Sequence, residues 1–275
     1  MLILPALSFC YEYELTICAI FQNEAPYLTE WLEFHQRQGV QHFYLYNNNS
    51  TDNWEEILEP YIINNIVTLT DWAQDYEEGD MAKWNSIQCG AYNHCLKQIR
   101  GEAKWCAFID LDEFLFSPYD PDLLLFNLSK LDKAEAIGVN CIRYGTSNKM
   151  LQPQDSIIDN LVMRSTLKDK KNLQIKSIVK PDRARYCVVP NWFFLKNQNL
   201  FLNEYGSCIS GGFTDYVSVD FFRINHYIFR DEMCFSRQKV ERYKKWGYRN
   251  SDIEDLIDLD AETLNDVEDK IVSQL

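Results

Sequence analysis

The chain has 275 residues, of which 46% are hydrophobic and 25% are charged, a composition typical of a soluble globular protein. This rules out a disordered tail, a collagen-like fibre and a coiled-coil rod, and it fits one large domain, alone or with a small appendage. The 41 acidic residues outnumber the 27 basic ones, and the net charge of −14 disfavours nucleic-acid binding and docking on anionic lipid.

The first part of the chain alternates between two hydrophobic periods. Short apolar runs predict strands at 15–21, 42–46, 66–69 and 105–109. Apolar residues at helical spacing predict a helix after each of the first three, starting near Pro26, Trp54 and Trp84. This β-α-β-α-β-α-β order predicts an α/β fold with a mostly parallel central sheet and helices on both of its faces.

Polar clusters follow all four predicted strands, at residues 22–24, 47–52, 71 and 110–113. Any one of these clusters could be turn or capping chemistry, because Asn, Asp and Ser favour such positions. Parallel strands, however, bring their carboxyl ends to one edge, where α/β proteins bind ligands. Four clusters together therefore predict a functional edge.

The pattern weakens after Glu113. We expect a helix at 120–131, a strand at 136–142, loops or a mobile lid at 145–173, and short strands and turns at 174–230, with a hinge or tight turn at Gly211-Gly212. A helix is predicted at 235–246. The acidic residues 251–275 predict an amphipathic helical tail.

Several common sites are missing from the sequence. There is no G-x-G-x-x-G after the first strand, no P-loop and no G-x-S-x-G elbow. The nine cysteines form no C-x-x-C pair, which argues against structural zinc and favours a reducing compartment. The apolar N-terminus has no basic n-region and is too short to span a bilayer, so we expect a cytoplasmic protein without a transmembrane segment.

Asp110-Leu111-Asp112 is the most suggestive chemical motif. In an extended segment, positions i and i+2 project to the same side, so two carboxylates there attract a hard cation. Mg2+ and Mn2+ prefer oxygen ligands and bridge carboxylates to substrate phosphates. A D-x-D occurs often by chance, but the end of an apolar strand gives it weight.

The four histidines divide into two groups. His226 lies between Arg223 and Arg230, and its imidazole is a candidate ligand for Mn2+; the alternative is a core histidine whose N–H is satisfied. The other three lie on predicted helices or strands and are interpreted as structural: His35, His42 and His94.

Taken together, these segments resemble glycosyltransferase family 92. The resemblance lies in residues 19–28 (AIFQNEAPYL), 43–52 (FYLYNNNSTD), 104–114 (KWCAFIDLDEF) and 176–181 (KSIVKP), and in His226-Tyr227 followed by Arg230. It covers approximately residues 15–245 and shades into the family 2-like group of the same fold.

The resemblance implies a GT-A-type, Rossmann-like nucleotide-diphospho-sugar transferase fold. Residues 1–250 would form one domain, with a nucleotide-sugar half at about 13–115 and an acceptor half at about 116–250, followed by the tail at 251–275. It implies transfer of a hexose from a UDP-sugar, with inversion and with Mn2+ or Mg2+, to a hydroxyl of a glycan, lipid-linked or protein-linked acceptor. Because eukaryotic relatives are membrane-anchored, we expect a soluble bacterial or viral enzyme.

The family pattern also implies site residues. Asp112 would bind the metal, Asp110 would face the ribose beside it or join the metal ligands, and His226 would complete the metal shell. Base and ribose would be surrounded by residues of the first two strand ends: Gln22, Asn23, Glu24, Asn48 and Asp52.

Further roles follow from the chemistry of transfer. The leaving diphosphate needs cations, for which the candidates are Lys176, Lys180 and Arg230. Inversion needs a carboxylate base, for which we favour Asp215 over Glu204, Asp220 and Asp231. Trp192 and Phe193 are either a sugar-stacking platform or core residues.

Two other functions are compatible with the fold. A sugar nucleotidyltransferase would need a Gly-rich basic loop after the first strand, where this chain has Asn23-Glu24-Ala25-Pro26. A non-catalytic carbohydrate-binding or scaffold protein would keep the fold but would not depend on Asp112.

Overall fold

The structure is a computed structural model that describes residues 11–75, 81–152, 155–230, 240–245, 247–249 and 263–274, together with Cys234, Ser251 and Ile253. Its strands are β1 Tyr13–Phe21, β2 His42–Asn47, β3 Val67–Asp71, β4 Ala103–Phe108, β5 Glu113–Phe116, β6 Ala136–Arg143, β7 Met163–Arg164, β8 Ile175–Val179, β9 Ala184–Val189, β10 Trp192–Leu195, β11 Phe201–Leu202, β12 Arg223–His226 and β13 Val267–Glu268. Its helices are α1 Ala25–Arg37, α2 Trp54–Ile63, α3 Met81–Gln98, α4 Leu123–Lys130, α5 Ile157–Asn160 and α7 Val240–Lys245, with 3-10 turns η1 Lys170–Leu173, η2 Gln198–Leu200 and η4 Val272–Gln274.

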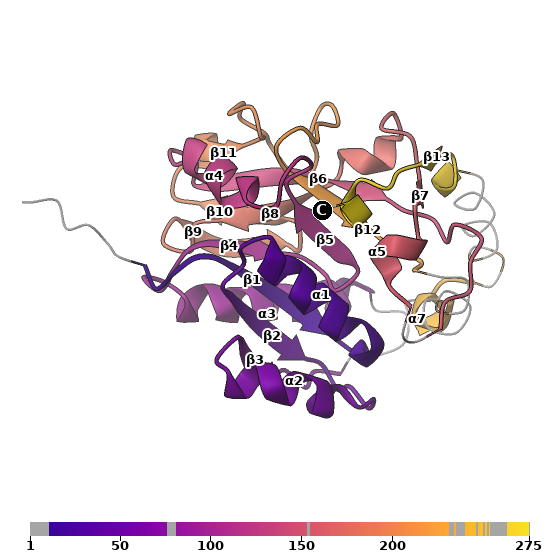
Figure 1. Cartoon of the computed structure of the whole chain (residues 1–275). Helices are drawn as coiled ribbons and strands as arrows, with labels where there is room; N and C mark the ends of the chain where they lie inside the picture. Colours follow the sequence, from indigo (N-terminus) through magenta and orange to yellow (C-terminus); the bar gives the residue numbers. More distant parts are fainter. Residues whose placement is uncertain are drawn as a thin grey trace, which may run out of the picture.

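A single central sheet joins the two predicted halves of the domain. Its order is β3-β2-β1-β4-β8-β6-β12-β5, with β11 beside β6. β1 to β4 run parallel to one another, as do β6, β11 and β12, whereas β8 and β5 pair antiparallel with their neighbours. The predicted mostly parallel α/β sheet is confirmed (Figure 1). Strand β5, directly after the D-x-D motif, was not predicted.

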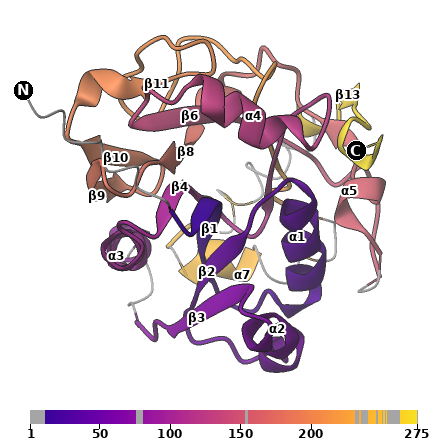
Figure 2. The same ribbon diagram turned by 60° about the vertical axis from the view of Figure 1, so that its left-hand side comes forward.

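Alternation along β1 explains the layers on either side of the sheet. Leu15, Ile17 and Ala19 are fully buried in one core with α1 and α2. Cys18 and Ile20 point the other way, into a second core with α3 and the β9–β10 hairpin. The sheet therefore lies between α1 and α2 on one face and α3 on the other (Figure 2). Burial on both faces explains the nearly continuous apolar runs of the strands.

Helix α1 fixes the position of β5. Pro26 lies in its first turn, and Gly39, at φ +87°, follows its end. Trp31 is fully buried, and its indole N–H donates to the Glu113 carbonyl at 2.8 Å. His35 Nδ1 lies 2.8 Å from the Trp31 carbonyl, and its Nε2 accepts the Leu115 N–H at 3.0 Å. α1 thus holds β5 by two side-chain bonds to its backbone.

The structural interpretation of the other histidines is confirmed. His42 lies 3.0 Å from the Asn65 carbonyl and 2.8 Å from Thr68 Oγ1, and His94 Nδ1 lies 2.9 Å from the Tyr46 hydroxyl. These contacts use the ring nitrogens within the fold. They leave His226 as the histidine at the sheet edge.

The C-terminal segment differs from the predicted helix. Its described part contains the strand β13, which pairs with β7, and the 3-10 turn η4 beside α5 (Figure 1). Asp269 accepts from Arg164 Nε at 2.5 Å and from Arg223 Nη2 at 3.0 Å, and Val272 is buried in the first core. This anchoring makes the segment part of the domain. Residues 254–262 lie outside the described residues.

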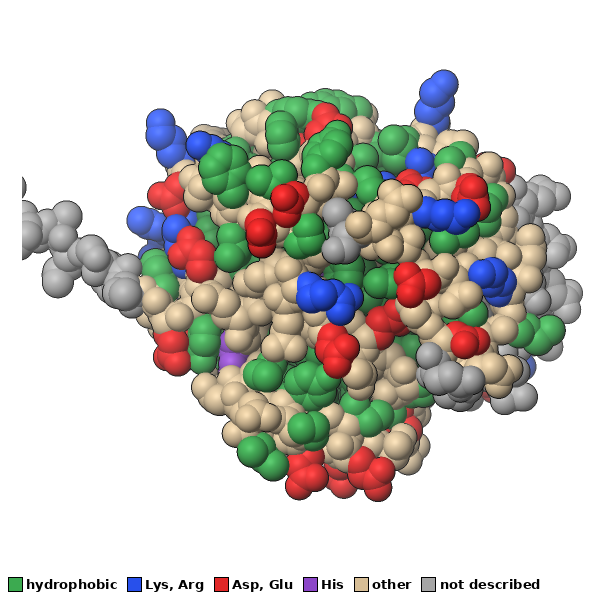
Figure 3. Space-filling view, in the orientation of Figure 1, with side chains coloured by type: hydrophobic (Ala, Val, Ile, Leu, Met, Phe, Trp, Pro, Cys, Tyr) green, Lys and Arg blue, Asp and Glu red, His purple; other side chains and the backbone are tan. Residues whose placement is uncertain are grey.

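Charges of both signs are interspersed on the surface shown in Figure 3. None of the helices in the described ranges combines the length and apolar character needed to cross a bilayer. The eight cysteines within those ranges are all reduced.

His35 generates a test of the fold. Burial lowers the pKa of His35 to about 3, so the folded protein keeps it neutral while the unfolded chain binds a proton below about pH 6.5. Its contribution to stability is present above that pH and is lost as the pH falls toward 3. In denaturant titrations between about pH 6 and pH 4.5, we expect the free energy of unfolding to fall about 1 kcal/mol per pH unit more steeply for wild type than for His35→Gln.

His42 does not affect the difference between the two proteins. Burial lowers the pKa of His42 too, but His42 is present in both proteins and contributes equally to both pH dependences. Parallel pH dependences for wild type and His35→Gln would contradict a neutral, buried His35.

Candidate functional site

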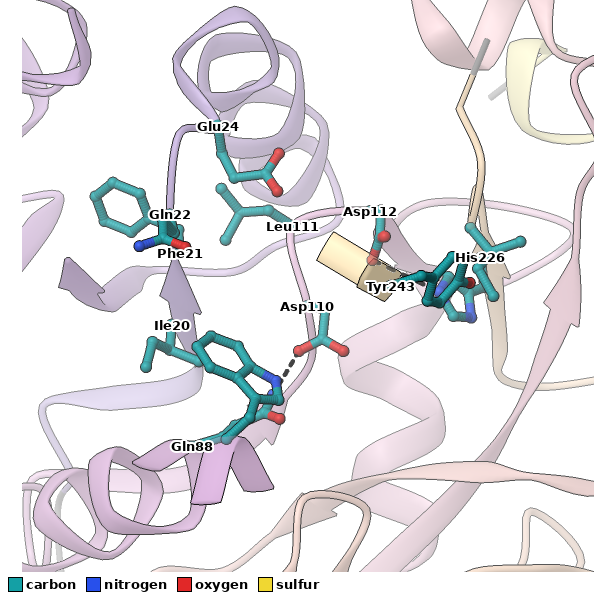
Figure 4. A pocket seen from close by; sticks show the side chains of 12 residues that line it. Ile20, Phe21, Gln22, Glu24, Gln88, Asp110, Leu111, Asp112, His226 and Tyr243 are labelled. Carbon is teal, nitrogen blue, oxygen red and sulfur yellow. Dashed lines mark hydrogen bonds and ion pairs between the residues drawn. The ribbon is translucent and has the colours of Figure 1, made fainter. Parts of the chain in front are cut away.

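A cavity of about 200 Å³ opens at the carboxyl ends of β1 and β4. It brings together five residues singled out from the sequence: Gln22, Glu24, Asp110, Asp112 and His226 (Figure 4). Apolar side chains complete its wall, contributed by β1, α3 and the D-x-D loop: Ile20, Phe21, Trp84 and Leu111. The predicted functional edge thus contains a concave site with converging carboxylates.

Asp112 and His226 face one another although they are far apart in sequence. His226 Nε2 lies 3.6 Å from Asp112 Oδ1, and Figure 4 shows the two side chains pointing toward each other. The cause is the antiparallel pairing of β12 with β5, in which His226 lies opposite Glu113. The Tyr227 N–H also donates to the Asp112 carbonyl at 2.8 Å. The fold therefore places a carboxylate and an imidazole where one cation could touch both.

Asp110 is held by the protein on both carboxylate oxygens. Its Oδ1 accepts from Gln88 Nε2 at 2.7 Å, and its Oδ2 lies 2.6 Å from Lys176 Nζ. Lys176 also lies 3.1 Å from Glu113 Oε2, which accepts the Asp110 N–H at 2.9 Å. These contacts form a triad in which Lys176 and Glu113 are buried and Asp110 is about one-third exposed.

The triad changes the expected role of Lys176. Its side chain is 6% exposed and lies between two carboxylates, so it neutralises them rather than reaching for a diphosphate. Burial raises the pKa of Glu113, and the Lys176 ammonium opposes that rise. Lys176 is thus the counter-ion that allows several acids to share this edge.

A second buried ion pair lies behind the cavity wall. The Arg230 guanidinium pairs with the carboxylate of Glu24 and lies 3.7 Å from the centre of the Tyr27 ring. Within the described part of the chain, Arg230 Nε and Nη1 have no hydrogen-bond acceptor. Arg230 is therefore the buried counter-ion of Glu24, which lines the cavity.

Three residues that were expected to contact the nucleotide form hydrogen bonds between the loops at the rim of the cavity. Asn23 Oδ1 accepts the Thr51 N–H at 2.7 Å, and Asn48 Oδ1 accepts the Gln74 N–H at 3.0 Å. Asp52 Oδ2 accepts the Ala25 N–H at 2.8 Å, at the start of α1. None of the three lines the cavity. Their contact with a nucleotide stays a prediction, whereas their role in shaping the rim is observed.

Three of the proposed bases, Asp215, Glu204 and Asp220, lie outside the cavity lining. Asp215 is exposed. Glu204 is buried and accepts the backbone N–H groups of Asp220, Phe221 and Phe222, and Asp220 itself accepts from the Tyr205 hydroxyl. Asp231 lies outside the described residues.

The remaining predicted residues lie in other parts of the fold. Phe193 is fully buried in the second core, and Trp192 stacks on Phe201 with ring centroids 4.0 Å apart, which supports the core interpretation of this pair. Lys180 Nζ lies 4.7 Å over the Trp105 ring and 3.1 Å from Asp132. The Lys180 ammonium therefore makes structural contacts with Asp132 and the Trp105 ring.

Two residues at the site were not assigned a role from the sequence. Gln88 lines the cavity and positions Asp110, and Glu113 completes the triad. The partner of each lies far away in the sequence, Asp110 for Gln88 and Lys176 for Glu113, so the local sequence pattern does not predict these contacts.

Comparison with known proteins shows to which protein family this chain belongs. The family model described as glycosyltransferase family 92 matches residues 12–207. The chain belongs to glycosyltransferase family 92. The resemblance stated from the motifs is thus confirmed, and the family agrees with the predicted enzyme class and GT-A-type fold.

The relatives that match this chain are longer proteins and share less than a third of their aligned residues with it. A family 92 protein of Oryza sativa subsp. japonica is 29% identical over 196 residues, covering 70% of this chain and 31% of its own length. The β-1,4-galactosyltransferase galt-1 of Caenorhabditis elegans is 25% identical over 178 residues, covering 62% and 41%. The chain therefore spans about a third of the length of the first of these relatives and less than half of the second.

Among solved structures, S. aureus TarS (residues 1–349) aligns with a TM-score of 0.40 and 14% identity, covering 61% of this chain and 47% of that chain. A likeness this partial adds nothing to the family assignment.

The triad generates a prediction for stability. Lys176→Met would leave the carboxylates of Asp110 and Glu113 close together without their counter-ion. Breaking a buried pair on one side typically costs about 3–5 kcal/mol, and we expect a loss of that size in the free energy of unfolding at neutral pH, measured by denaturant titration.

The control is Lys270→Met, which removes a 2.6 Å pair with Glu268 whose side chains are more than half exposed. Exposed pairs contribute about 0–1 kcal/mol. Equal losses for the two variants would show that Lys176 does not stabilise the carboxylates.

Proposed function

We propose that this chain is a metal-dependent glycosyltransferase that moves a hexose from a UDP-hexose to a hydroxyl of a glycan, lipid-linked or protein-linked acceptor, with inversion. Membership of family 92 supports the reaction class. The observation that carries the proposal is the approach of Asp112 and His226 to 3.6 Å at the carboxyl edge of the sheet. Beside them lie a cavity and the buried guanidinium of Arg230, which suit a ligand rich in phosphate oxygens.

The residues present fit a divalent cation. Within the described ranges, no three His, Cys, Asp or Glu side chains are grouped as a complete metal centre. Mg2+ is usually held by one or two carboxylates together with substrate phosphates and water, so Asp112 with His226 is a sufficient protein share. When bound there, Mn2+ or Mg2+ would neutralise the charge that develops on the leaving diphosphate. Asp110, engaged by Lys176 and Gln88, is left to face the ribose.

The cavity wall supports a nucleotide donor. Trp84 offers aromatic surface to a base, and Gln22, whose amide donates to the Asn48 carbonyl at 2.8 Å, lies on the rim. Several relatives carry β-1,4-galactosyltransferase names, among them the nematode protein above and an Arabidopsis thaliana galactan β-1,4-galactosyltransferase, which is 31% identical over 112 residues. UDP-galactose is therefore the first donor to test.

Proton transfer is assigned to the chain's own carboxylates. An inverting reaction needs one carboxylate to accept the proton of the acceptor hydroxyl. We retain Asp215 for this role, with its exposed side chain in the loop after Gly211-Gly212. We also retain the expectation of a soluble cytoplasmic protein of bacterial or viral origin as a proposal.

The proposal predicts nucleotide-dependent stabilisation. We expect UDP to raise the melting temperature only when Mn2+ is present, and GDP and CMP to raise it less. Saturation to about 100 times Kd corresponds to about 2.7 kcal/mol of stabilisation. Asp112→Asn should lose the Mn2+-dependent part of the shift.

The control for that substitution is Asp122→Asn, at an exposed aspartate whose side chain makes no capping bond. It should shift as wild type does. If no nucleotide shifts the wild type with or without Mn2+, a non-catalytic binding protein of the same fold becomes the better account.

Turnover is tested by hydrolysis of UDP-galactose without acceptor. Losing an electrostatic contact made mainly in the transition state typically lowers kcat by about 10²–10³, so we expect at least a 100-fold loss for Asp112→Asn. Asp122→Asn should keep wild-type turnover. Unchanged hydrolysis by Asp112→Asn would contradict the proposed site.

A further inference from the structure

The two carboxylate oxygens of the buried Glu113 have different surroundings. Its side chain is 1% exposed, and Oε2 receives both the Lys176 ammonium, at 3.1 Å, and the Asp110 N–H, at 2.9 Å. Oε1 is buried and has no hydrogen-bond partner within the described part of the chain. Buried acceptors are nearly always hydrogen-bonded, so Oε1 indicates a bond that the site forms under other conditions.

The imidazole of His226 lies close to that oxygen. Its Nδ1 lies 3.6 Å from Glu113 Oε1, and its Nε2 lies 3.6 Å from Asp112 Oδ1. The ring is thus bracketed by two carboxylates, because β12 pairs antiparallel with β5 and sets His226 directly opposite Glu113. Bonds at active sites are often long without ligand and shorten when it binds.

The position of one proton decides what His226 can do. A neutral imidazole carries its proton on one nitrogen and offers a lone pair only at the other. A proton on Nδ1 satisfies Glu113 Oε1 and leaves the lone pair of Nε2 beside Asp112. A proton on Nε2 would point at Asp112, leave Glu113 Oε1 without a donor, and remove the imidazole from any cation there.

We propose that Glu113 is a positioning residue that holds the proton of His226 on Nδ1 and so keeps Nε2 as the ligand nitrogen beside Asp112. A hydrogen bond at the far ring nitrogen commonly fixes the tautomer of ligating histidines. The consequence for cation binding rests on the proposed function, whereas the tautomer is a property of the protein alone.

The first experiment reads the tautomer directly. Protein labelled with 15N-histidine is studied by long-range 15N–1H NMR at about pH 8, without metal or nucleotide. The chain has only four histidines, so loss of one signal set in His226→Gln assigns that residue. We expect the Nδ1–H tautomer for His226 in the wild type, and the Nε2–H tautomer would overturn the proposal.

The second experiment replaces the carboxylate with its amide. In Glu113→Gln, Lys176 and the Asp110 N–H both require an acceptor, so the amide oxygen takes that side and the NH2 group faces His226 Nδ1. We expect the His226 proton to move to Nε2, and Mn2+ affinity, measured by electron paramagnetic resonance, to fall about 10–100-fold. Glu135→Gln, at a buried glutamate that accepts the Asn197 N–H, should change neither readout.

The outcomes separate this inference from the proposed function. A fall in Mn2+ affinity with an unchanged tautomer would show that Glu113 acts through charge alone and would overturn the positioning role. An Nδ1–H tautomer in a wild type that binds no Mn2+ would support Glu113 as the positioning residue and would count against the metal-dependent transferase. If Glu113→Gln does not fold, the wild-type tautomer decides.

Discussion

The antiparallel pairing of β5 with β12 is the interaction on which the site depends. β5 begins directly after Asp112, and β12 ends at His226, so the backbone ladder between them sets the distance between these two side chains. Two bonds from α1 hold β5 in place, one from Trp31 and one to His35. A strand of four residues thus connects the packing of the first core to the geometry of the sheet edge.

Several acidic side chains lie close together at this edge of the sheet, so their negative charges need cationic partners. Asp110, Asp112 and Glu113 lie within four residues of sequence, and burial together with the charges of the two aspartates raises the pKa of Glu113. Lys176 neutralises two of them from β8, and Arg230 neutralises Glu24 across the cavity wall. Asp112 lines the cavity, and its Oδ1 lies 3.6 Å from His226 Nε2. Its position makes it the natural ligand for a cation that accompanies a phosphorylated donor.

Local periodicity was sufficient to predict much of this fold from the sequence. The first four strands and three helices follow from apolar runs and helical spacing, and the shared edge follows from parallel topology. The contacts of Lys176 could not be predicted because its partners, Asp110 and Glu113, lie in a segment far from it in the sequence. Strand β5 escaped prediction because it is short and follows a polar motif, and the C-terminal strand because pairing with β7 and the contacts of Asp269 override its helical pattern. Asn23, Asn48 and Asp52 were assigned to a ligand although they bond to neighbouring loops.

The central claim is that Asp112 and His226 share one cation at the edge of the sheet. The most direct measurement is anomalous X-ray diffraction from crystals grown with Mn2+ and UDP, recorded on both sides of the manganese absorption edge. The account predicts a manganese peak within coordination distance of an Asp112 carboxylate oxygen and His226 Nε2, with the diphosphate on its open side. Diphosphate density in the cavity without a manganese peak between these residues, or manganese bound elsewhere, would contradict it.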